Sequence, residues 1–498
     1  MPLSSRIVVV LPAPFGPSSA TTSPGSTRNV TPSRARSLPK ARVRSSVSMV
    51  AGTSRSLAQW QYVSAVPDRL AVPVREAEVV ADVDVCVAGG GPAGLGAALA
   101  AARLGARVCL LERHAFLGGN FTAASVGTVC GLYVSEGDSF SYVTRGIAEE
   151  VAEALKAQGS AFGPMPFKGT AVLLYVPWAA KRLFDHLATD EERITLFLHA
   201  LVADVVRDGD RLEAVVVATK RGPQAVRART FVDATGDADL VVHAGAPWTI
   251  GDAGQRQYAS MQFVMQHVDV GAAMAAGLDT LGKLIADHGG HLSRDSGAVL
   301  PTLRPGEVIG AMTRVRAADG GPLDVTDLAQ ATYGELEGRR LAEEAAAFLI
   351  EHMPGFDDAF LADTAPTLGV RETRRAVGEY VLTGDDVSGL ARFDDAVAAG
   401  AWPREYHVTG RSTEYVSLPE GGWYQVPLRS LRPRGLANVW VAGRCISADH
   451  DALASTRVMA PSMALGQAAG TAAALGARGD GSVASVQASL KEQGAFLG

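Results

Sequence analysis

The sequence predicts an α/β fold built on a parallel sheet. Three observations support it: a glycine-rich turn between two apolar runs at 84–112, short β-rich runs at 194–232, and a further apolar strand at 438–442. The first turn has the spacing Gly89-x-Gly91-x-x-Gly94 and is followed by a helical stretch and a second strand. This order of strand, turn, helix, strand predicts a Rossmann-like, dinucleotide-binding domain.

Each residue of the turn has a predicted role. Gly89 allows the tight turn, Gly91 lets the backbone approach a pyrophosphate, and Gly94 lets the helix pack closely on the strand. The N-terminus of the following helix favours a phosphate through its free N–H groups and its dipole. Glu112 ends the second strand, where a carboxylate can accept hydrogen bonds from ribose hydroxyls.

Composition limits the classes of protein. The chain has 498 residues, 47% of them hydrophobic, which is enough for a large core and two connected domains. The net charge is −6, and the acidic body argues against a general nucleic-acid binder; no apolar run is long enough to cross a membrane. The four cysteines form no CxxC pair and the histidines no HExxH motif, so we expect a reducing, cytoplasmic setting and no metal.

Residues 1–78 are expected to form a disordered N-terminal extension. The first 67 residues contain no Asp or Glu, are rich in Ser, Arg and Pro, and lack apolar periodicity. An organellar transit peptide matches this composition, whereas the apolar run is too short for a secretory signal. We favour a third interpretation, in which the segment is translated from an upstream start and Met49 is closer to the true one.

The middle of the chain contains further elements. Helices are predicted at 146–158 and 178–188, followed by an antiparallel meander from Ile194 to Val232 and a buried strand that ends in a glycine–acid turn. Residues 246–432 leave the nucleotide-binding domain, with a helix at 339–351 and loops at 285–307 and 384–422. Pro461 suits the first turn of a further helix, whose small residues would let it lie tightly on the sheet.

The order of these elements resembles the FAD-dependent oxidoreductases of the glutathione-reductase-like fold, and in particular the bacterial family with a single dinucleotide-binding domain. Gly118-Gly119 matches the second glycine motif of these proteins, and Ala234-Thr235-Gly236-Asp237 matches the segment that returns to the flavin domain. The resemblance covers about residues 79–476 and continues through 367–383, 423–431, 441–447 and 457–467.

The resemblance implies FAD as cofactor and an inserted α+β substrate domain. It implies an FAD-binding domain at 79–245 and 433–478, a substrate or cap domain at 246–432, and a C-terminal tail at 479–498. In flavoproteins of this fold a helix such as the one beginning near Pro461 points its N-terminus at the N1–O2 edge of the isoalloxazine ring, where its dipole favours the reduced anion. The expected FAD-binding residues are Gly89, Gly91, Pro92, Ala93, Gly94, Glu112, Arg113, Gly118, Gly119, Val202, Thr235, Gly236, Asp237, Gly443, Arg444, Ser462 and Met463.

Three residues are candidates for catalysis. Arg371, in the run GVRETRR, can hold a substrate carboxylate through its planar fork, but it and its neighbours can equally pair with Glu372 and Glu379 to brace the domain seam. His407 and His450 can act as acid–base groups, although an isolated histidine more often has a structural role.

These features favour an FAD-dependent oxidoreductase that transfers a hydride between a small organic substrate and the flavin. Two alternatives remain: a flavin-bearing RNA-modifying or scaffold protein, and a flavin monooxygenase. The acidic body disfavours the first, and residues 246–432 contain no second GxGxxG for a reductant site, which disfavours the second. A homo-oligomer is possible, with no nucleic acid or membrane as partner.

Overall fold

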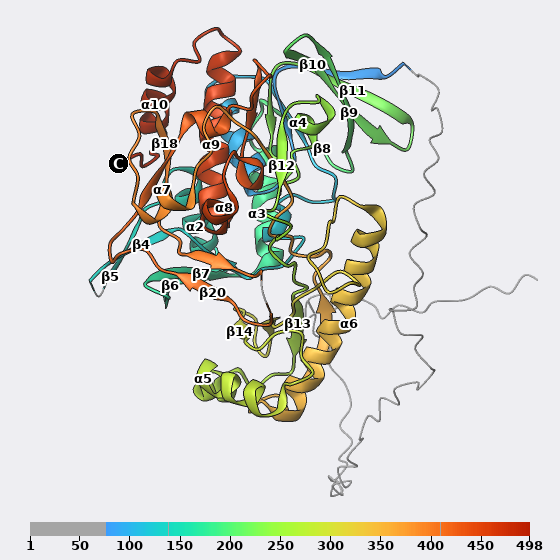
Figure 1. The fold of residues 1–498 in the computed structure, drawn as a ribbon, viewed down its shortest axis with the longest axis vertical. Helices are drawn as coiled ribbons and strands as arrows, with labels where there is room; N and C mark the ends of the chain where they lie inside the picture. Colours follow the sequence, from blue (N-terminus) through green and yellow to red (C-terminus); the bar gives the residue numbers. More distant parts are fainter. Residues whose placement is uncertain (1–75, 138, 409) are drawn as a thin grey trace, which may run out of the picture. The chain divides into compact units, whose positions relative to one another are not determined.

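A seven-stranded sheet forms the centre of the nucleotide-binding half (Figure 1). The computed structural model describes residues 76–137, 139–408 and 410–498, which all belong to one unit, 55–498. Residues 1–75 of the predicted extension lie outside the described residues. The strand order is β8 (Ile194–Phe197), β2 (Val108–Leu111), β1 (Glu78–Ala88), β11 (Gly222–Asp233), β10 (Arg211–Thr219) and β9 (Leu201–Asp208), and β22 (Val439–Val441) also pairs with β11.

The long strand β11 joins the parallel part of this sheet to its antiparallel part. Its first half pairs antiparallel with β10, whereas Phe231–Asp233 pairs parallel with β22. The predicted meander is therefore confirmed for β9, β10 and β11. The first strand of the predicted range, β8, instead pairs parallel with β2 and extends the nucleotide-binding sheet.

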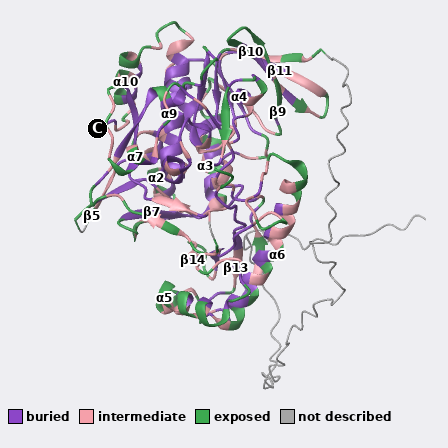
Figure 2. Cartoon of the chain, in the orientation of Figure 1, coloured by how far each residue is buried: buried purple, intermediate pink, exposed green. Residues whose placement is uncertain are grey.

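Helices α1 (Pro92–Arg103) and α9 (Met459–Gly476) pack backbone against backbone. A Cβ atom added to Gly466 would meet the carbonyl of Ala93, and one added to Gly470 would meet that of Ala97. The hydroxyl of Thr230 on β11 donates to the carbonyl of Ala473, 3.0 Å away, which ties α9 to the sheet as well. The small residues thus serve the contact with α1 in addition to the predicted contact with the sheet, and Figure 2 shows α9 almost entirely buried.

Further elements complete this half of the molecule. Helices are found at both predicted positions, as α2 and α3, and the predicted C-terminal tail contains α10, whose Val486 and Leu490 are buried in the main core. The elements are η2 (Gly119–Phe121), β3 (Thr128–Val129), β4 (Tyr133–Glu136), β5 (Ser139–Tyr142), α2 (Ile147–Ala157), β6 (Ala161–Phe167), β7 (Thr170–Tyr175), α3 (Pro177–Thr189), α4 (Asp239–His243), η4 (Gly443–Cys445), α8 (His450–Thr456) and α10 (Val483–Glu492).

A second hydrophobic core lies within residues 259–368. It consists of a four-stranded antiparallel sheet with the order β14 (Ala298–Pro301), β15 (Val308–Ala311), β13 (Phe263–Gln266) and β16 (Phe360–Thr364), with α5 (Val270–His288) and α6 (Leu328–His352). Helix α6 starts earlier than the predicted 339 because the carboxylate of Asp327 caps it, accepting from the amide of Gln330 at 2.8 Å. This α+β unit matches the predicted type of inserted domain.

The second core is shorter than the predicted range 246–432. Strands β18 (Ala396–Gly400) and β21 (Tyr424–Pro427) lie in that range but bury Val397 and Tyr424 in the main core. The two predicted loops, 285–307 and 384–422, also contain short helices and strands. Elements this short do not produce a periodic pattern of apolar residues that the sequence could reveal. The remaining elements of the range are β12 (Trp248–Ile250), β17 (Arg374–Ala376), α7 (Gly384–Ser388), β19 (Arg404–Tyr406), β20 (Glu414–Val416) and η3 (Leu428–Leu431).

The described residues contain neither a membrane-spanning helix nor a metal-binding cluster. None of the helices in that part of the chain has the length and apolar character needed to span a bilayer. The same residues include no group of three or more His, Cys, Asp or Glu side chains that could hold a metal ion.

Candidate active site

A cleft of about 980 Å³, including its open mouth, lies at the carboxyl ends of the parallel strands. This is where open α/β sheets bind their ligands. Its walls are formed by 89, 91–93, 111–114, 119, 120, 123, 200–202, 234–236, 239, 367, 368, 370, 442–444, 457, 459 and 462.

The glycine turn at the start of α1 has the geometry expected for a phosphate site. Gly89 has a φ of +98°, which favours glycine. A Cβ atom on Gly94 would collide with the carbonyl of Gly89, so no larger residue fits there. A Cβ atom on Gly91 would meet nothing nearer than the Cα of Gly119, 3.8 Å away, and Gly91 lines the cleft. The turn therefore presents bare backbone to a ligand at the N-terminus of α1.

Glu112 directly follows β2 and is held by backbone amides. Its Oε2 accepts from the N–H of Gly90 at 2.8 Å, and its Oε1 accepts from the N–H of His114 at 2.7 Å. The residue is 4% exposed and lines the cleft. The two bonds fix the orientation of the carboxylate and leave its remaining lone pairs for a ligand.

The second glycine pair is packed against the first turn. The amide of Gly118 donates to the carbonyl of Gly90 at 2.8 Å, and a Cβ atom on Gly119 would lie 3.0 Å from the Cα of Gly91. Both glycines have positive φ, +113° and +49°. The pair therefore closes the cleft around the start of α1.

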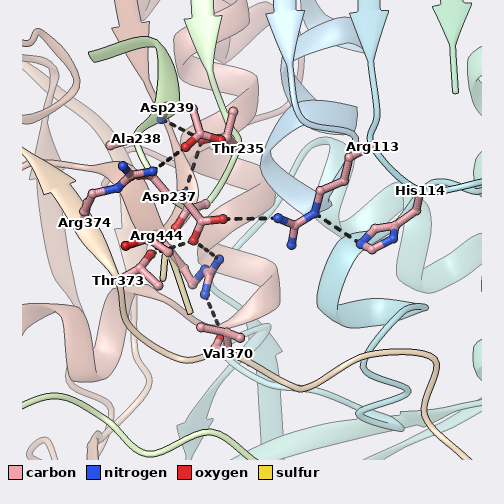
Figure 3. A network of polar contacts seen from close by, with 12 residues as sticks. Arg113, His114, Thr235, Asp237, Ala238, Asp239, Val370, Thr373, Arg374 and Arg444 are labelled. Atoms are coloured by element: carbon pink, nitrogen blue, oxygen red, sulfur yellow. Dashed lines mark hydrogen bonds and ion pairs between the residues drawn. The ribbon is translucent and has the colours of Figure 1, made fainter. Parts of the chain in front are cut away.

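Asp237 is the centre of a polar network beside the cleft (Figure 3). It accepts from the hydroxyl of Thr373 at 2.8 Å and pairs with Arg444 at 3.2 Å and Arg113 at 3.5 Å. The other end of Arg444 donates to the carbonyl of Val370 at 2.7 Å. Asp237 thus positions two arginines of the cleft wall without lining the cleft itself.

The predicted FAD-binding residues fall into two groups. Gly94, Gly118, Asp237 and Met463 lie behind the cleft wall. The residues that line it are Gly89, Gly91, Pro92, Ala93, Glu112, Arg113, Gly119, Val202, Thr235, Gly236, Gly443, Arg444 and Ser462.

Cys445 faces away from the cleft. Its sulfur accepts from the amides of Gly236 and Ala238, at 3.1 and 3.3 Å. Burial, followed by the charge of Asp233, holds the pKa of this thiol well above its ordinary value. The residue therefore stabilises the glycine–acid turn as a neutral thiol.

Two of the three predicted catalytic residues lie in one cluster, which we call the Glu405 cluster: Arg371, Glu405, His407 and Arg457. His407 Nε2 is 3.0 Å from Oε1 of Glu405, and Arg457 Nη2 is 3.7 Å from Oε2. Arg371 donates from Nη1 to the carbonyl of Tyr258 at 2.7 Å and to the hydroxyl of Ser260 at 2.6 Å. Arg457 lines the cleft and joins the cluster to it.

The hydrogen-bond pattern of His407 assigns its tautomer. Its Nδ1 is 3.5 Å from Nη2 of Arg314, and because a guanidinium only donates, Nδ1 accepts and Nε2 carries the proton. Burial, and then the charge of Arg371, lowers the pKa of His407 well below its ordinary value. Burial opposes ionisation of Glu405, but the neighbouring His407 and the two arginines outweigh it and hold its pKa well below the usual range. The pair is therefore a neutral imidazole beside a carboxylate.

His450, the third predicted residue, lies in a different cluster. Its Nδ1 is 2.9 Å from Oε2 of Glu372, which also pairs with Arg375. Arg374 pairs with Asp239. These two arginines of the GVRETRR run therefore brace the structure, whereas Arg371 reaches the Glu405 cluster. Glu379 pairs with Arg432 instead.

Sequence reasoning missed Glu405, Tyr415 and Met459. Glu405 lies on the three-residue strand β19, and the hydroxyl of Tyr415 on β20 donates to it at 3.0 Å. No spacing marks either residue as functional. Met459 and Arg457 lie in the 457–467 run, which is one of the segments that resemble the family. That resemblance is the signal that could have identified these two residues.

The parallel sheet, the glycine turn opening α1 and the acid after β2 define a dinucleotide-binding α/β protein. The chain belongs to the family of FAD dependent oxidoreductases, whose family model matches residues 84–493. FAD is therefore the cofactor, and the bare backbone at Gly91 and the oriented Glu112 fit the pyrophosphate and ribose of that dinucleotide.

Solved structures with a similar fold were found. A geranylgeranyl bacteriochlorophyll reductase-like protein from Thermoplasma acidophilum is 14% identical, with a TM-score of 0.45 and 83% of each chain covered. A p-nitrophenol 4-monooxygenase from Pseudomonas putida DLL-E4 is 12% identical, with a TM-score of 0.45, 83% of this chain covered and 85% of that chain. A search of curated protein sequences gave no match.

Proposed function

We propose that this protein transfers a hydride between a small organic substrate and FAD. The observation that supports this most directly is that one cleft connects the dinucleotide-binding turn to the Glu405 cluster. Gly91 lines one part of the cleft and Arg457 another, and Leu368, a residue of the second core, lines it too. A cofactor bound along the turn would thus extend toward a buried group of ionisable side chains.

The residues of the chain have separate roles in this proposal. The turn from Gly89 to Gly94 binds the pyrophosphate, and Glu112 binds the ribose. FAD supplies the two-electron chemistry when bound. Arg457 and Ser462 lie on the cleft wall, on either side of the first residue of α9. In that position they orient the part of the cofactor or substrate that binds at the start of this helix. The Glu405 cluster contacts the substrate.

Glu405, rather than His407, is the member of this pair that offers free acceptor sites to a substrate. Both ring nitrogens of His407 already have partners, and the residue is 2% exposed. The Glu405 side chain is 16% exposed and ionised, and its lowered pKa makes it a weak base, so it can accept hydrogen bonds from a substrate rather than a proton. His407 therefore acts as a positioning residue for this carboxylate.

The test is anaerobic bleaching of the purified holoenzyme. The visible spectrum is recorded first, and small acids, amines and alcohols are then added without oxygen. We expect a yellow protein whose absorbance near the flavin maximum falls with at least one compound. A protein that stays colourless after incubation with FAD would contradict the proposal. So would a yellow protein that turns over only when NADPH and oxygen are both supplied, which is the behaviour of a monooxygenase.

A further inference from the structure

Four arginines gather around Glu405 and His407. Arg371 and Arg457 belong to the Glu405 cluster, and Arg314 reaches His407 Nδ1 at 3.5 Å. Arg294 donates to the hydroxyl of Thr413 at 2.9 Å, and that hydroxyl is itself 3.3 Å from His407 Nδ1. The arginines come from four separate parts of the chain, so the fold, rather than a local run of sequence, creates this concentration of positive charge.

Negative charge near Arg371 is scarcer than positive charge. The largest charge effects on Arg371 come from Arg457, Arg294 and Arg314, with Glu405 as the opposing carboxylate. The charge of Asp295 acts in the opposite sense on Arg314. Burial, followed by the charge of Arg457, lowers the pKa of Arg371 to about 9, so the side chain is still charged at neutral pH. A buried charge is stable only when it is paired, and here guanidinium groups outnumber carboxylates.

Arg457 also has one donor without a hydrogen-bond partner. Its side chain is 8% exposed and lines the cleft. Nη2 donates to the carbonyl of Glu405 at 3.2 Å, while Nε is buried and has no hydrogen-bond partner among the described residues. A buried donor without a partner is uncommon in folded proteins, and a water molecule, an ion or a ligand can provide the acceptor.

We infer that the substrate of this oxidoreductase is an organic anion, whose carboxylate or phosphate group binds to Arg371 and Arg457 beside the cleft. The inference rests on the proposed function and deepens it, because it names the chemical class of the substrate. An oxyanion would add negative charge beside Arg371 and Arg457, where guanidinium groups outnumber carboxylates, and would offer an acceptor to the Nε of Arg457. The planar fork of a guanidinium matches both a carboxylate and a phosphate. Glu405, which His407 holds in place, would repel a second negatively charged group on its side of the site. This repulsion would set the orientation of the substrate.

The test is anion binding to the yellow holoenzyme. Equilibrium dialysis at constant ionic strength with radiolabelled succinate, methyl phosphate and neutral succinamide gives the affinity of each probe. We expect about one bound succinate or methyl phosphate per chain and a dissociation constant at least tenfold weaker for succinamide. Preference between the two anions identifies the oxyanion as a carboxylate or a phosphate.

Matched variants locate the site. Arg371→Lys and Arg457→Lys keep the charge but lose the fork, and each should weaken anion binding at least tenfold with unchanged FAD content. Arg340→Lys is the control, because Arg340 pairs with Glu337 and Glu344 on α6 outside the cleft wall, and its affinity should equal that of the wild type. If one cluster variant loses FAD, the other still decides the result, and the comparison of probes on the wild type needs neither.

The outcomes separate the two proposals. A yellow, substrate-bleached protein that binds neither anion, or binds succinamide equally well, would refute the anionic substrate and leave the oxidoreductase intact. Unchanged anion affinity in both cluster variants would refute the assigned site. A protein that binds the anions but holds no FAD would refute the proposed function instead.

Discussion

His407 donates its Nε2 proton to Oε1 of Glu405, across 3.0 Å, at a position where the histidine is 2% exposed. The histidine is neutral in the folded protein although a carboxylate is its partner, because burial and the charge of Arg371 oppose a second proton. An imidazole kept neutral by its surroundings has a direct effect on stability in acid.

The first prediction concerns pH. The pKa of His407 is lower in the folded than in the unfolded protein, so the unfolded chain takes up a proton below about 6.5 and the folded one does not. Stability is therefore lost as the pH falls below about 6.5, by up to about 1.4 kcal/mol per pH unit for this proton. His407→Gln keeps a polar side chain but does not titrate, so its thermal midpoint should fall less between pH 6.5 and 5.5 than that of the wild type. An equal fall would contradict a neutral His407.

The second prediction concerns the cofactor. Glu112→Arg removes the ribose acceptor that Gly90 and His114 orient, and Gly91→Val places a branched side chain in the cleft. Each should raise the FAD dissociation constant at least tenfold, a loss of about 1.4 kcal/mol or more. The control for charge reversal is Glu343→Arg, on the exposed side of α6. Fluorescence titration of the apoprotein measures the constants, and full flavin occupancy in both cleft variants would show that the site is wrong.

The third prediction concerns the contact between α1 and α9. A Cβ atom on Gly470 would meet backbone atoms of Ala97, whereas one on Gly282 in α5 meets nothing within 4 Å. Gly470→Ala should destabilise the protein by about 1–3 kcal/mol through overpacking. Gly282→Ala is the matched substitution and should stabilise it slightly, since alanine has the higher helix propensity. Thermal melts of both variants check the result, and a midpoint for Gly470→Ala at or above the wild-type value would rule out the close contact.

The fourth prediction concerns the reductant. Residues 246–432 contain no second GxGxxG turn, so a site for a nicotinamide dinucleotide is not expected there. In anaerobic stopped-flow traces, neither NADH nor NADPH should reduce the flavin efficiently, and oxygen, a quinone or a protein would be the oxidant. The control is dithionite, which should bleach the same sample completely. Rapid bleaching by NADPH alone would overturn this prediction.

Sequence reasoning worked where function depends on local spacing. The turn from Gly89 to Gly94, Glu112 and the second glycine pair are close in sequence, and their order alone places them at the end of a parallel strand. The meander was predictable for a similar reason, because short turns link its strands.

It failed where function depends on contacts between distant segments. Glu405 is an ordinary acid on a short strand, and its neighbours Arg371 and Arg457 lie 34 residues before and 52 residues after it. Nothing in the sequence distinguishes Arg371, which reaches the cluster, from Arg375, which pairs with Glu372 three residues away. The three-dimensional arrangement makes that distinction, because only one of these side chains faces Ser260.

The close contact between α1 and α9 also has a consequence for biosynthesis. The proposed pyrophosphate turn leaves the ribosome long before α9 does, yet Gly96, Gly466 and Gly470 hold the helix that follows this turn against α9. A nascent chain that ends before α9 lacks Ser462 and the wall on that side, so it should not retain FAD. The yellow colour of bound flavin would then appear only when translation ends. Flavin binding would therefore indicate that the whole chain has folded.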